Sequence, residues 1–329
     1  MALHLPAVFY RSLAPLVNLT DRRFWLPGQR RYNGGGPLGL RKRMPHHWRC
    51  MLRHSDVNWR TNDGLQLYGE LWEPNQAPRG IVCLVHGLGE HCGRYGHVAA
   101  ALTPAAYALS AYDQRGHGKS EGQRGHAPSW DSLLDDIALS LEKAARRFPD
   151  APRFLYGHSL GANLVLTYCL QRRPQLAGVI ATGPLLRPAF QPAAWKMALG
   201  KLLYGVWPGF ALNNELDPKG ISQDPKVVDA YVHDPLVHDR VSARLGMDLL
   251  KEGAWALEHA SEFELPLLLM NGDSDPICSP QAVGEFGSRT GASCTYKTWP
   301  GLYHEIHNEP EQQRVFEFMI SWLNKHTPQ

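Results

Sequence analysis

The chain has 329 residues, of which 43% are hydrophobic and 20% charged, so it is long enough to bury a sizeable core. Its 10 Trp, 12 Tyr and 10 Phe residues exclude a wholly disordered protein. The net charge of +3 conceals an asymmetry, because residues 1–50 hold nine of the 34 Lys and Arg residues and one of the 31 acidic residues. The remainder is net negative, and a basic tail without a basic folded face argues against nucleic-acid binding.

The basic segment, residues 1–52, is expected to be a disordered N-terminal extension. It resembles a transit peptide in being rich in Arg and poor in acids. A non-native extension is the alternative, since Met44 and Met51 stand just before the first folded pattern. A secretory signal is not expected, because the first basic residue, Arg11, follows the apolar start instead of preceding it.

The pattern of hydrophobic residues predicts no membrane span. The most apolar region, around residues 185–212, is broken by charges, and the longest uncharged piece there has 13 residues, against the roughly 20 that a span needs. None of the six cysteines forms a CxxC pair, which favours a reducing compartment over a disulfide framework. We therefore expect a cytoplasmic protein, with peripheral contact to membranes as an option.

Strand and helix patterns alternate along the rest of the chain. Two short strands at residues 57–60 and 65–72 flank the turn Asn62-Asp63-Gly64, which is typical of a hairpin. Further strands are predicted at residues 81–86, 107–113, 154–156, 176–181, 265–270 and 294–299. Helices are predicted at residues 130–144, with Ser129 as the N-cap, at 160–170 and at 312–323.

Such alternation predicts an α/β fold, with a mostly parallel central sheet and helices on both of its faces. The domain is expected to cover residues 53–325. Residues 184–250 fit neither strand spacing nor a single helix, and they are rich in Trp, Phe, Leu and Pro. Because this stretch lies between two predicted sheet strands, we interpret it as an inserted helical cap.

The strongest local signal is the pentapeptide Gly157-His158-Ser159-Leu160-Gly161, where a predicted strand gives way to a buried helix. In this context G-x-S-x-G is typical of a sharp turn that exposes a nucleophilic serine, with free N–H groups of the helix N-terminus beneath it. A chance match in a glycine-rich loop is the alternative. The position at the carboxyl end of a strand favours Ser159 as a nucleophile.

A nucleophilic serine needs a base and an acid that orients the base, which follow in the order acid, then His in this kind of fold. The strand at 265–270 is followed by Asp273 and Asp275, and the strand at 294–299 by His304 and His307. Spacing alone leaves both choices open. The oxyanion donors are expected to be the backbone N–H groups of Leu160 and of Leu88 in the loop after residues 81–86.

Three strings together are similar to the monoacylglycerol lipase and lysophospholipase branch of the α/β-hydrolases. They are His86-Gly87-Leu88-Gly89-Glu90-His91-Cys92-Gly93-Arg94-Tyr95, Asp113-Gln114-Arg115-Gly116-His117-Gly118-Lys119-Ser120 and the pentapeptide at Ser159. The resemblance covers roughly residues 55–325. It implies an α/β-hydrolase fold, a triad of Ser159, Asp275 and His304, and a site for the polar head of the substrate at Glu90, Arg94 and His307.

The cap predicts the class of substrate. Residues 190–210 hold Phe190, Trp195, Leu202 and Trp207 with few charges, so we expect an apolar groove above Ser159 and an exposed patch that touches lipid surfaces transiently. Some of these side chains must simply pack the cap. Burial of an acyl chain, at about 0.8 kcal/mol per CH₂, would dominate binding, which favours a monoacylglycerol or lysophospholipid over a small ester.

Rival interpretations keep the same scaffold. A general carboxylesterase for small esters, a peptidase or a peroxidation enzyme would share the triad, whereas a dehalogenase or epoxide hydrolase would have Asp in place of Ser159. A non-catalytic scaffold protein is disfavoured because every triad position is filled. No cofactor or metal is predicted, because the histidines lack ligand spacing and Asp113 stands where a phosphate loop ending at Lys119-Ser120 would need Gly.

Overall fold

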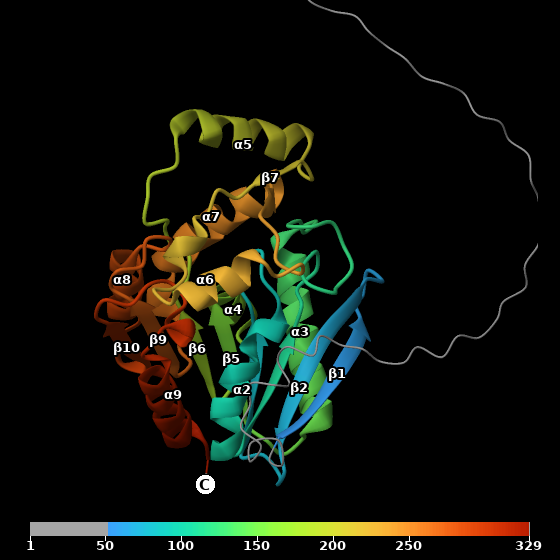
Figure 1. The fold of residues 1–329 in the computed structure, drawn as a ribbon, viewed down its shortest axis with the longest axis vertical. Coiled ribbons are helices and arrows are strands. Elements are labelled where there is room, and N and C mark those ends of the chain that lie inside the picture. Colours follow the sequence, from blue (N-terminus) through green and yellow to red (C-terminus); the bar gives the residue numbers. More distant parts are fainter. Residues whose placement is uncertain (1–51, 329) are drawn as a thin grey trace, which may run out of the picture. The chain divides into compact units, whose positions relative to one another are not determined.

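The computed structural model describes residues 52–328, so the predicted N-terminal extension lies outside the described residues except for its last position. An eight-stranded sheet forms the centre of this part, in the order β1-β2-β4-β3-β5-β6-β9-β10 (Figure 1). Its strands are β1 (Leu52–Arg60), β2 (Gln66–Pro74), β3 (Gly80–Val85), β4 (Tyr107–Tyr112), β5 (Arg153–His158), β6 (Gly178–Thr182), β9 (Leu267–Gly272) and β10 (Cys294–Trp299).

Strand direction follows the pattern of apolar residues. The strands from β4 to β10 in this order pair in parallel, and β3, β4 and β9 are buried at every position, as strands covered on both faces must be. β1 and β2 form an antiparallel hairpin at one edge, and β2 pairs antiparallel with β4. The predicted α/β architecture is confirmed, and the hairpin is longer than predicted.

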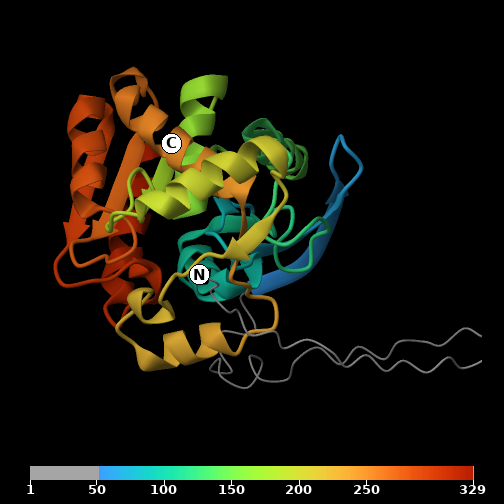
Figure 2. The same cartoon turned by 90° about the horizontal axis from the view of Figure 1, so that it is seen from above.

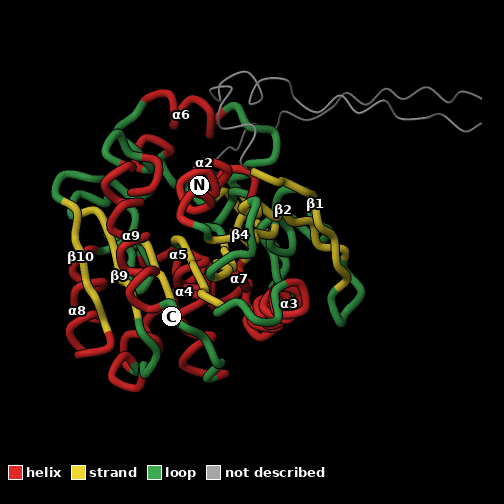
Figure 3. The backbone as a smooth tube through the Cα atoms, turned by 90° about the horizontal axis from the view of Figure 1, so that it is seen from below, coloured by secondary structure: helices red, strands yellow, loops and turns green. Residues whose placement is uncertain are grey.

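Helices cover both faces of the sheet (Figures 1 and 3). α2 (Gly96–Leu102) and α9 (Gln312–His326) enclose one apolar cluster with the strands. α3 (Trp130–Arg147), α4 (Leu160–Arg172), α7 (Ala243–Glu258) and α8 (Pro280–Thr290) enclose the other. Short 3-10 turns lie at Cys92–Tyr95, Thr103–Ala105, Pro218–Gly220, Ala260–Glu262, Gly291–Ser293 and Ile306–Asn308.

The order of the parallel strands reverses between β3 and β5. β4 follows β3 on one side, while β5, β6, β9 and β10 follow on the other. Loops that leave the carboxyl ends of β3 and β5 therefore diverge, and a crevice opens between them, which is where ligands bind in sheets of this kind. The predicted oxyanion loop follows β3, and Ser159 follows β5.

The segment between β6 and β9 extends above the carboxyl edge of the sheet (Figures 1 and 2). It contains α5 (Ala194–Val206), α6 (Pro225–Val232) and a two-stranded ribbon of β7 (Ala211–Asn213) and β8 (Arg240–Ser242). Neither α5 nor α6 buries a residue. The predicted cap range of 184–250 also includes the first half of α7, which packs on α4 and belongs to the layer that covers the sheet.

Gly161, the second residue of α4, provides a test of how tightly this helix packs on the sheet. A Cβ atom there would lie 2.0 Å from the Val85 carbonyl oxygen, which is backbone and cannot yield. We expect Gly161→Ala to lower the free energy of unfolding by about 1–3 kcal/mol or more, measured by urea denaturation. Gly205→Ala in α5, where a Cβ meets nothing within 4 Å, should instead change it by no more than about 1 kcal/mol. Equal stability of the two variants would contradict this packing.

Candidate active site

Ser159 occupies a strained turn between β5 and α4. Its backbone angles are φ 55° and ψ −115°, a region that residues with a side chain seldom adopt, at a cost of about 1–3 kcal/mol. The turn is held by neighbouring backbone, because the Ser159 N–H donates to the Thr182 carbonyl at 3.0 Å and its own carbonyl accepts from the Asn163 N–H at 3.0 Å. This is the geometry predicted from the pentapeptide, and it directs the hydroxyl away from the sheet.

The glycines on either side of Ser159 are sterically required. A Cβ on Gly157 would lie 2.3 Å from the Gly161 carbonyl oxygen, and one on Gly161 would meet Val85. The turn is therefore tight enough to bring the start of α4 against β3. The serine hydroxyl is then fixed at the crevice between β3 and β5.

His304 and Asp275 are joined by a hydrogen bond. The His304 Nδ1–H donates to Asp275 Oδ2 at 2.8 Å, and both side chains are buried. The other oxygen of Asp275 accepts the N–H groups of Ile277 at 2.8 Å and Cys278 at 3.0 Å, which fixes the carboxylate. Because Nδ1 is committed to Asp275, Nε2 is the ring nitrogen of His304 that remains to accept a proton.

The electrostatics of His304 differ from those of its neighbours. Burial would lower the pKa of His304, but the Asp275 carboxylate raises it well above its ordinary value. His158, whose ring centre is 4.8 Å away, has a pKa lowered to about 4, chiefly by burial. Burial likewise holds the pKa of His307 well below its usual range. His304 is thus the imidazole beside Ser159 that is built to accept a proton and remain stable as a cation.

The alternative acid and base have other partners. Asp273 is exposed, and its carboxylate accepts the Gly301 N–H at 2.7 Å, so it shapes the loop after β10. His307 is buried and stacked on Tyr95 with ring centres 5.1 Å apart. Of the pairs that spacing left open, the structure brings together Asp275 and His304.

The predicted oxyanion donors lie on either side of Ser159. Leu160 is the first residue of α4, so its N–H has no partner within the helix. Leu88 lies in the loop after β3, and this loop passes so close that a Cβ on Gly87 would be 3.2 Å from the Ser159 Cβ. Within the described residues, the N–H groups of Leu88 and Leu160 donate no hydrogen bond to the backbone of a loop, turn or helix cap.

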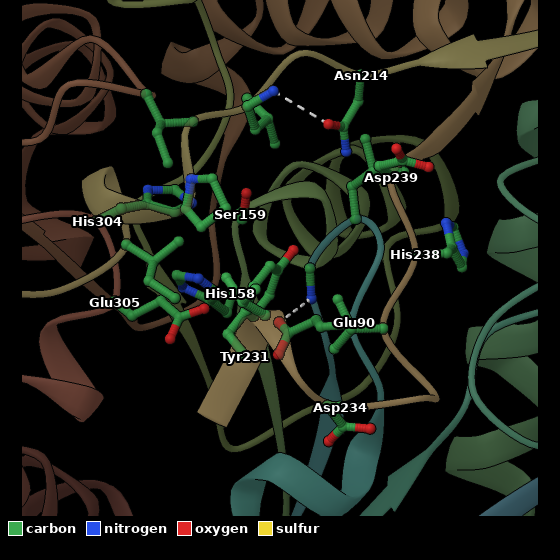
Figure 4. A pocket seen from close by; sticks show the side chains of 18 of the residues that line it. Glu90, His158, Ser159, Asn214, Tyr231, Asp234, His238, Asp239, His304 and Glu305 are labelled. Atoms are coloured by element: carbon green, nitrogen blue, oxygen red, sulfur yellow. Dashed lines mark hydrogen bonds between the residues drawn. The ribbon is translucent and has the colours of Figure 1, made fainter. Parts of the chain in front are cut away.

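A cavity of about 490 Å³ opens above Ser159 (Figure 4). Ser159 and His304 lie at one wall, and cap segments form the roof. Its apolar lining consists of Leu88, Leu216, Pro218, Ile221, Val232, Val237 and Ile277. The aromatic residues Phe190, Trp195 and Trp207, which were expected to form this groove, do not line it, and all three are exposed to solvent in and beside α5.

The three residues predicted at the polar head of the substrate lie at different depths. Glu90 lines the cavity, whereas Arg94 and His307 are behind its wall. Arg94 donates to Glu90 at 2.5 Å and to both oxygens of Glu305, at 2.8 and 2.7 Å. Contact of Arg94 or His307 with a substrate stays a prediction.

Sequence reasoning missed eight polar residues that line the cavity: His158, Asn214, Tyr231, Asp234, His238, Asp239, Arg240 and Glu305. His158 directly precedes Ser159 in the sequence, and Glu305 directly follows His304. This proximity to the predicted triad was the signal from which their place at the cavity could have been predicted. Tyr231 is in the last turn of α6, and the centre of its ring lies 4.8 Å from the Arg94 guanidinium, a contact that no local sequence pattern indicates. Asp234 accepts a hydrogen bond from His91 at 3.0 Å, which joins the cap to the loop after β3.

Two groups of donor atoms have spacing suited to a metal ion: Glu90, His158 and Glu305, and Asp275, Cys278 and His304. In the first group Arg94 already bonds both carboxylates, and in the second Asp275 and His304 bond each other. Among the described residues, the carboxylates of both groups are therefore already bonded by other protein groups.

Comparisons with known proteins agree with this geometry. The sequence profile of a family described as serine aminopeptidase S33 matches residues 76–311. The chain belongs to this family. It is 37% identical over 277 residues to an uncharacterised abhydrolase domain-containing protein of Dictyostelium discoideum, of which it spans only 29%. It is also 34% identical to the monoacylglycerol lipase of Mycolicibacterium smegmatis, covering 80% of this chain and 94% of that protein.

A solved structure of a similar protein shows the same fold. The crystal structure of the monoacylglycerol lipase of Paleococcus ferrophilus superposes with a TM-score of 0.72 at 34% sequence identity. The match covers 83% of this chain and 99% of that one. The α/β-hydrolase fold and the predicted family resemblance are therefore confirmed.

The raised pKa of His304 predicts the acid limb of the pH–rate profile. Protonated His304 cannot accept the serine proton, so kcat/KM should fall as pH decreases through a pKa above 6.5, the ordinary value for histidine. Asp275→Asn removes the carboxylate that raises this pKa. We expect kcat to fall by about 10⁴-fold. The acid limb of the pH–rate profile, measured on the activity that remains, should move to lower pH.

Asp273→Asn serves as the matched control, because an asparagine oxygen can still accept the Gly301 N–H. Its pH profile, measured with p-nitrophenyl butyrate, should be that of the wild type. An acid limb that stays in place in Asp275→Asn, or that moves in Asp273→Asn, would contradict the assignment of the pair.

Proposed function

We propose that this protein is a serine hydrolase that cleaves carboxylic esters of lipids, with monoacylglycerols as the preferred class. The observation that carries the proposal is the Asp275–His304 hydrogen bond beside a strained Ser159, below a cavity with an apolar lining. The relatives described as monoacylglycerol lipases support the same conclusion.

The proposed reaction uses an acyl-enzyme. Ser159 attacks the ester carbonyl while His304 takes its proton, and Asp275 stabilises the imidazolium. The N–H groups of Leu88 and Leu160 bind the oxyanion. His304 then protonates the leaving alcohol, and a water molecule, activated by the same imidazole, releases the fatty acid.

Charge around the cavity favours a neutral head group. Four carboxylates line it, those of Glu90, Asp234, Asp239 and Glu305, against the single guanidinium of Arg240. Arg94 neutralises part of this charge from behind, but its donors are occupied by Glu90 and Glu305. The charge of Asp234 and Asp239, which Arg94 does not bond, repels a phosphate but not a neutral glycerol head, so monoacylglycerols fit the cavity better than lysophospholipids.

The apolar lining of the cavity supports the binding of an acyl chain. Leu216, Ile221 and Ile277 come from the cap and from the loop that carries Asp275. Each methylene group that such a lining buries contributes about 0.8 kcal/mol to binding. A general esterase for small esters would gain nothing from this surface, which is why we place it second.

Replacement of the nucleophile tests the proposed reaction. We expect Ser159→Ala to lower monoacylglycerol hydrolysis by about four to six orders of magnitude and to abolish labelling by a fluorophosphonate probe, because no other group can form the acyl-enzyme. Circular dichroism should show an unchanged fold. Labelling that persists in Ser159→Ala would place the nucleophile elsewhere.

A substrate panel tests the head group and the chain length. With one acyl chain, kcat/KM should be higher for the monoacylglycerol than for the lysophosphatidylglycerol, since only the latter brings a phosphate to the carboxylates. Across p-nitrophenyl esters, kcat/KM should rise with chain length from the acetate upwards. Equal rates for both lipids would remove the charge argument, and an optimum at acetate would favour the general esterase.

We further propose that α5 contacts lipid surfaces. Its residues Trp195, Leu199, Leu202 and Val206 recur at helical spacing and are exposed, and Trp207 directly follows. Trp195 is 65% exposed and Trp207 62% exposed, a patch that a soluble surface seldom leaves open. Lys196 on the same helix is paired with Glu215, and Lys201 is the only other charged residue of α5, so the attraction is expected to be mainly apolar.

The double variant Trp195→Ser/Trp207→Ser tests this contact. We expect weaker sedimentation with phosphatidylcholine vesicles and a higher KM for dispersed monoacylglycerol, with unchanged turnover of dissolved p-nitrophenyl butyrate. The control is Tyr296→Ser, which removes an exposed aromatic residue on β10, away from the cap. Vesicle binding that is the same in all three proteins would argue against α5 as the contact surface.

Two further observations bear on location. Among the described residues, no helix is long and apolar enough to cross a membrane. The five cysteines that the structure describes are all unpaired, which supports our proposal of a reducing compartment such as the cytoplasm, with the protein peripheral to membranes.

A further inference from the structure

The Glu90 carboxylate is bound mainly by protein groups. Its Oε1 accepts hydrogen bonds from the Gly87 N–H at 2.6 Å and the Tyr95 hydroxyl at 2.8 Å, and its Oε2 accepts from Arg94 at 2.5 Å. The bond to Gly87 is the dashed line at Glu90 in Figure 4. With its side chain only 3% exposed, Glu90 has little capacity left for a substrate hydroxyl.

Gly87 is held at its carbonyl as well as at its N–H. The Gln114 N–H donates to His86 Nε2 at 3.0 Å, which assigns the proton of the neutral imidazole to Nδ1. Nδ1–H then donates to the Gly87 carbonyl at 2.8 Å. Because this carbonyl and the Leu88 N–H belong to one planar peptide unit, the two bonds on Gly87 set the direction of the Leu88 N–H.

We propose that Glu90 is a positioning residue for the oxyanion hole: its carboxylate, fixed by Arg94 and Tyr95, holds the loop after β3 so that the Leu88 N–H points at the developing oxyanion. The inference rests on the proposed function only in requiring Ser159 as the nucleophile. An oxyanion donor must lie within about 2.7–3.1 Å of the charge, so a small rotation of this peptide removes its contribution.

The electrostatics support a permanently ionised Glu90. Burial would raise the pKa of Glu90, but Arg94, with smaller contributions from His158, His86 and the Gly87 N–H, lowers it to about 2. Loss of the carboxylate would also leave the Gly87 N–H buried without a partner, which favours a rearranged loop. Glutamine can still accept from Gly87 through its oxygen, but its amide N–H₂ would then face the Arg94 donors.

A positioning role and a head-group role predict different kinetics. If Glu90 binds the glycerol head, its loss should raise KM for monoacylglycerol and leave p-nitrophenyl butyrate, which has no glycerol, unaffected. If Glu90 positions the oxyanion loop, both substrates should lose kcat by the same factor, because both form the same oxyanion.

We expect Glu90→Ala to lower kcat by about 10²–10³-fold for both substrates, with KM little changed, and Glu90→Gln to lower it less. Fluorophosphonate labelling of Ser159 should slow in the same order, because that reaction also passes through the oxyanion hole. A loss confined to monoacylglycerol, or seen in KM alone, would overturn the inference, as would wild-type kcat in both variants.

Asp113→Asn is the matched control for stability. Asp113 is also a buried carboxylate, with one oxygen that accepts the Cys92 N–H at 2.8 Å and another that accepts the Lys119 N–H at 2.7 Å, but it bonds no atom of residues 86–90. Its variant should lower the urea midpoint without lowering kcat. An equal loss of kcat in Asp113→Asn would mean that Glu90 acts through stability alone.

The labelling experiment separates the two proposals. If the wild-type protein is not labelled at Ser159, the proposed function fails. If Ser159 is labelled and Glu90→Ala turns over both esters as the wild type does, only the inference about Glu90 fails.

Discussion

The close approach of three backbone segments around Ser159 is the constraint on which the site depends. Ser159 has a positive φ. Gly157 and Gly161, two residues before and after it, have no room for a side chain, because the start of α4 packs against the end of β3. Packing of these buried elements offsets the strain of the turn. The oxyanion loop follows β3 directly, so the same contact that strains the nucleophile also brings the Leu88 N–H toward it.

Buried charge then sorts similar side chains into different roles. The rings of His304 and His307 each contact that of His158, with centres 4.8 and 4.7 Å away, and burial disfavours the cation of all three. Only His304 among these three has a carboxylate bonded to its ring, and only its pKa is raised. The other two remain neutral and provide a polar but uncharged surrounding. The single hydrogen bond that His304 donates to Asp275 therefore distinguishes the proposed base from the other two imidazoles.

Much of the fold could be predicted because its signals are local. Apolar runs identify the buried strands, and the spacing of apolar residues from Trp130 to Ala144 identifies α3. Ser129 caps that helix as predicted, since its hydroxyl oxygen accepts a hydrogen bond from the Ser132 N–H. α8 was missed, although Ser279-Pro280 is a helix-start signal, because Gly284 and Gly287 interrupt its pattern. Ser159 could be identified because its signal is also local: five consecutive residues define its turn.

What sequence could not supply depends on contacts between distant segments. The aromatic residues Phe190, Trp195 and Trp207 of the cap were expected above Ser159, yet an apolar sequence pattern alone cannot tell a buried face from an exposed one. The family resemblance placed Glu90 at the polar head of the substrate, whereas its bonds to Gly87 and Tyr95 depend on how the loop folds back on itself and could not be predicted from the sequence. Tyr231 reaches the cavity only because α6 lies over the loop after β3.

The loop after β3, which carries the proposed oxyanion donor Leu88, is also hydrogen-bonded to the cap. The contacts that cover the substrate cavity therefore also hold this loop. The Gly89 carbonyl accepts the His238 N–H at 2.8 Å, and a Cβ on Gly89, whose φ is +79°, would lie 2.3 Å from the His238 carbonyl oxygen. His91, at the end of the same loop, donates to Asp234 in the cap. The loop is thus held from below by Glu90 and from above by residues 234–238. If the Leu88 N–H binds the oxyanion as we propose, a displacement of residues 234–238 would disturb it, and the roof of the cavity and the stabilisation of the oxyanion would depend on one another.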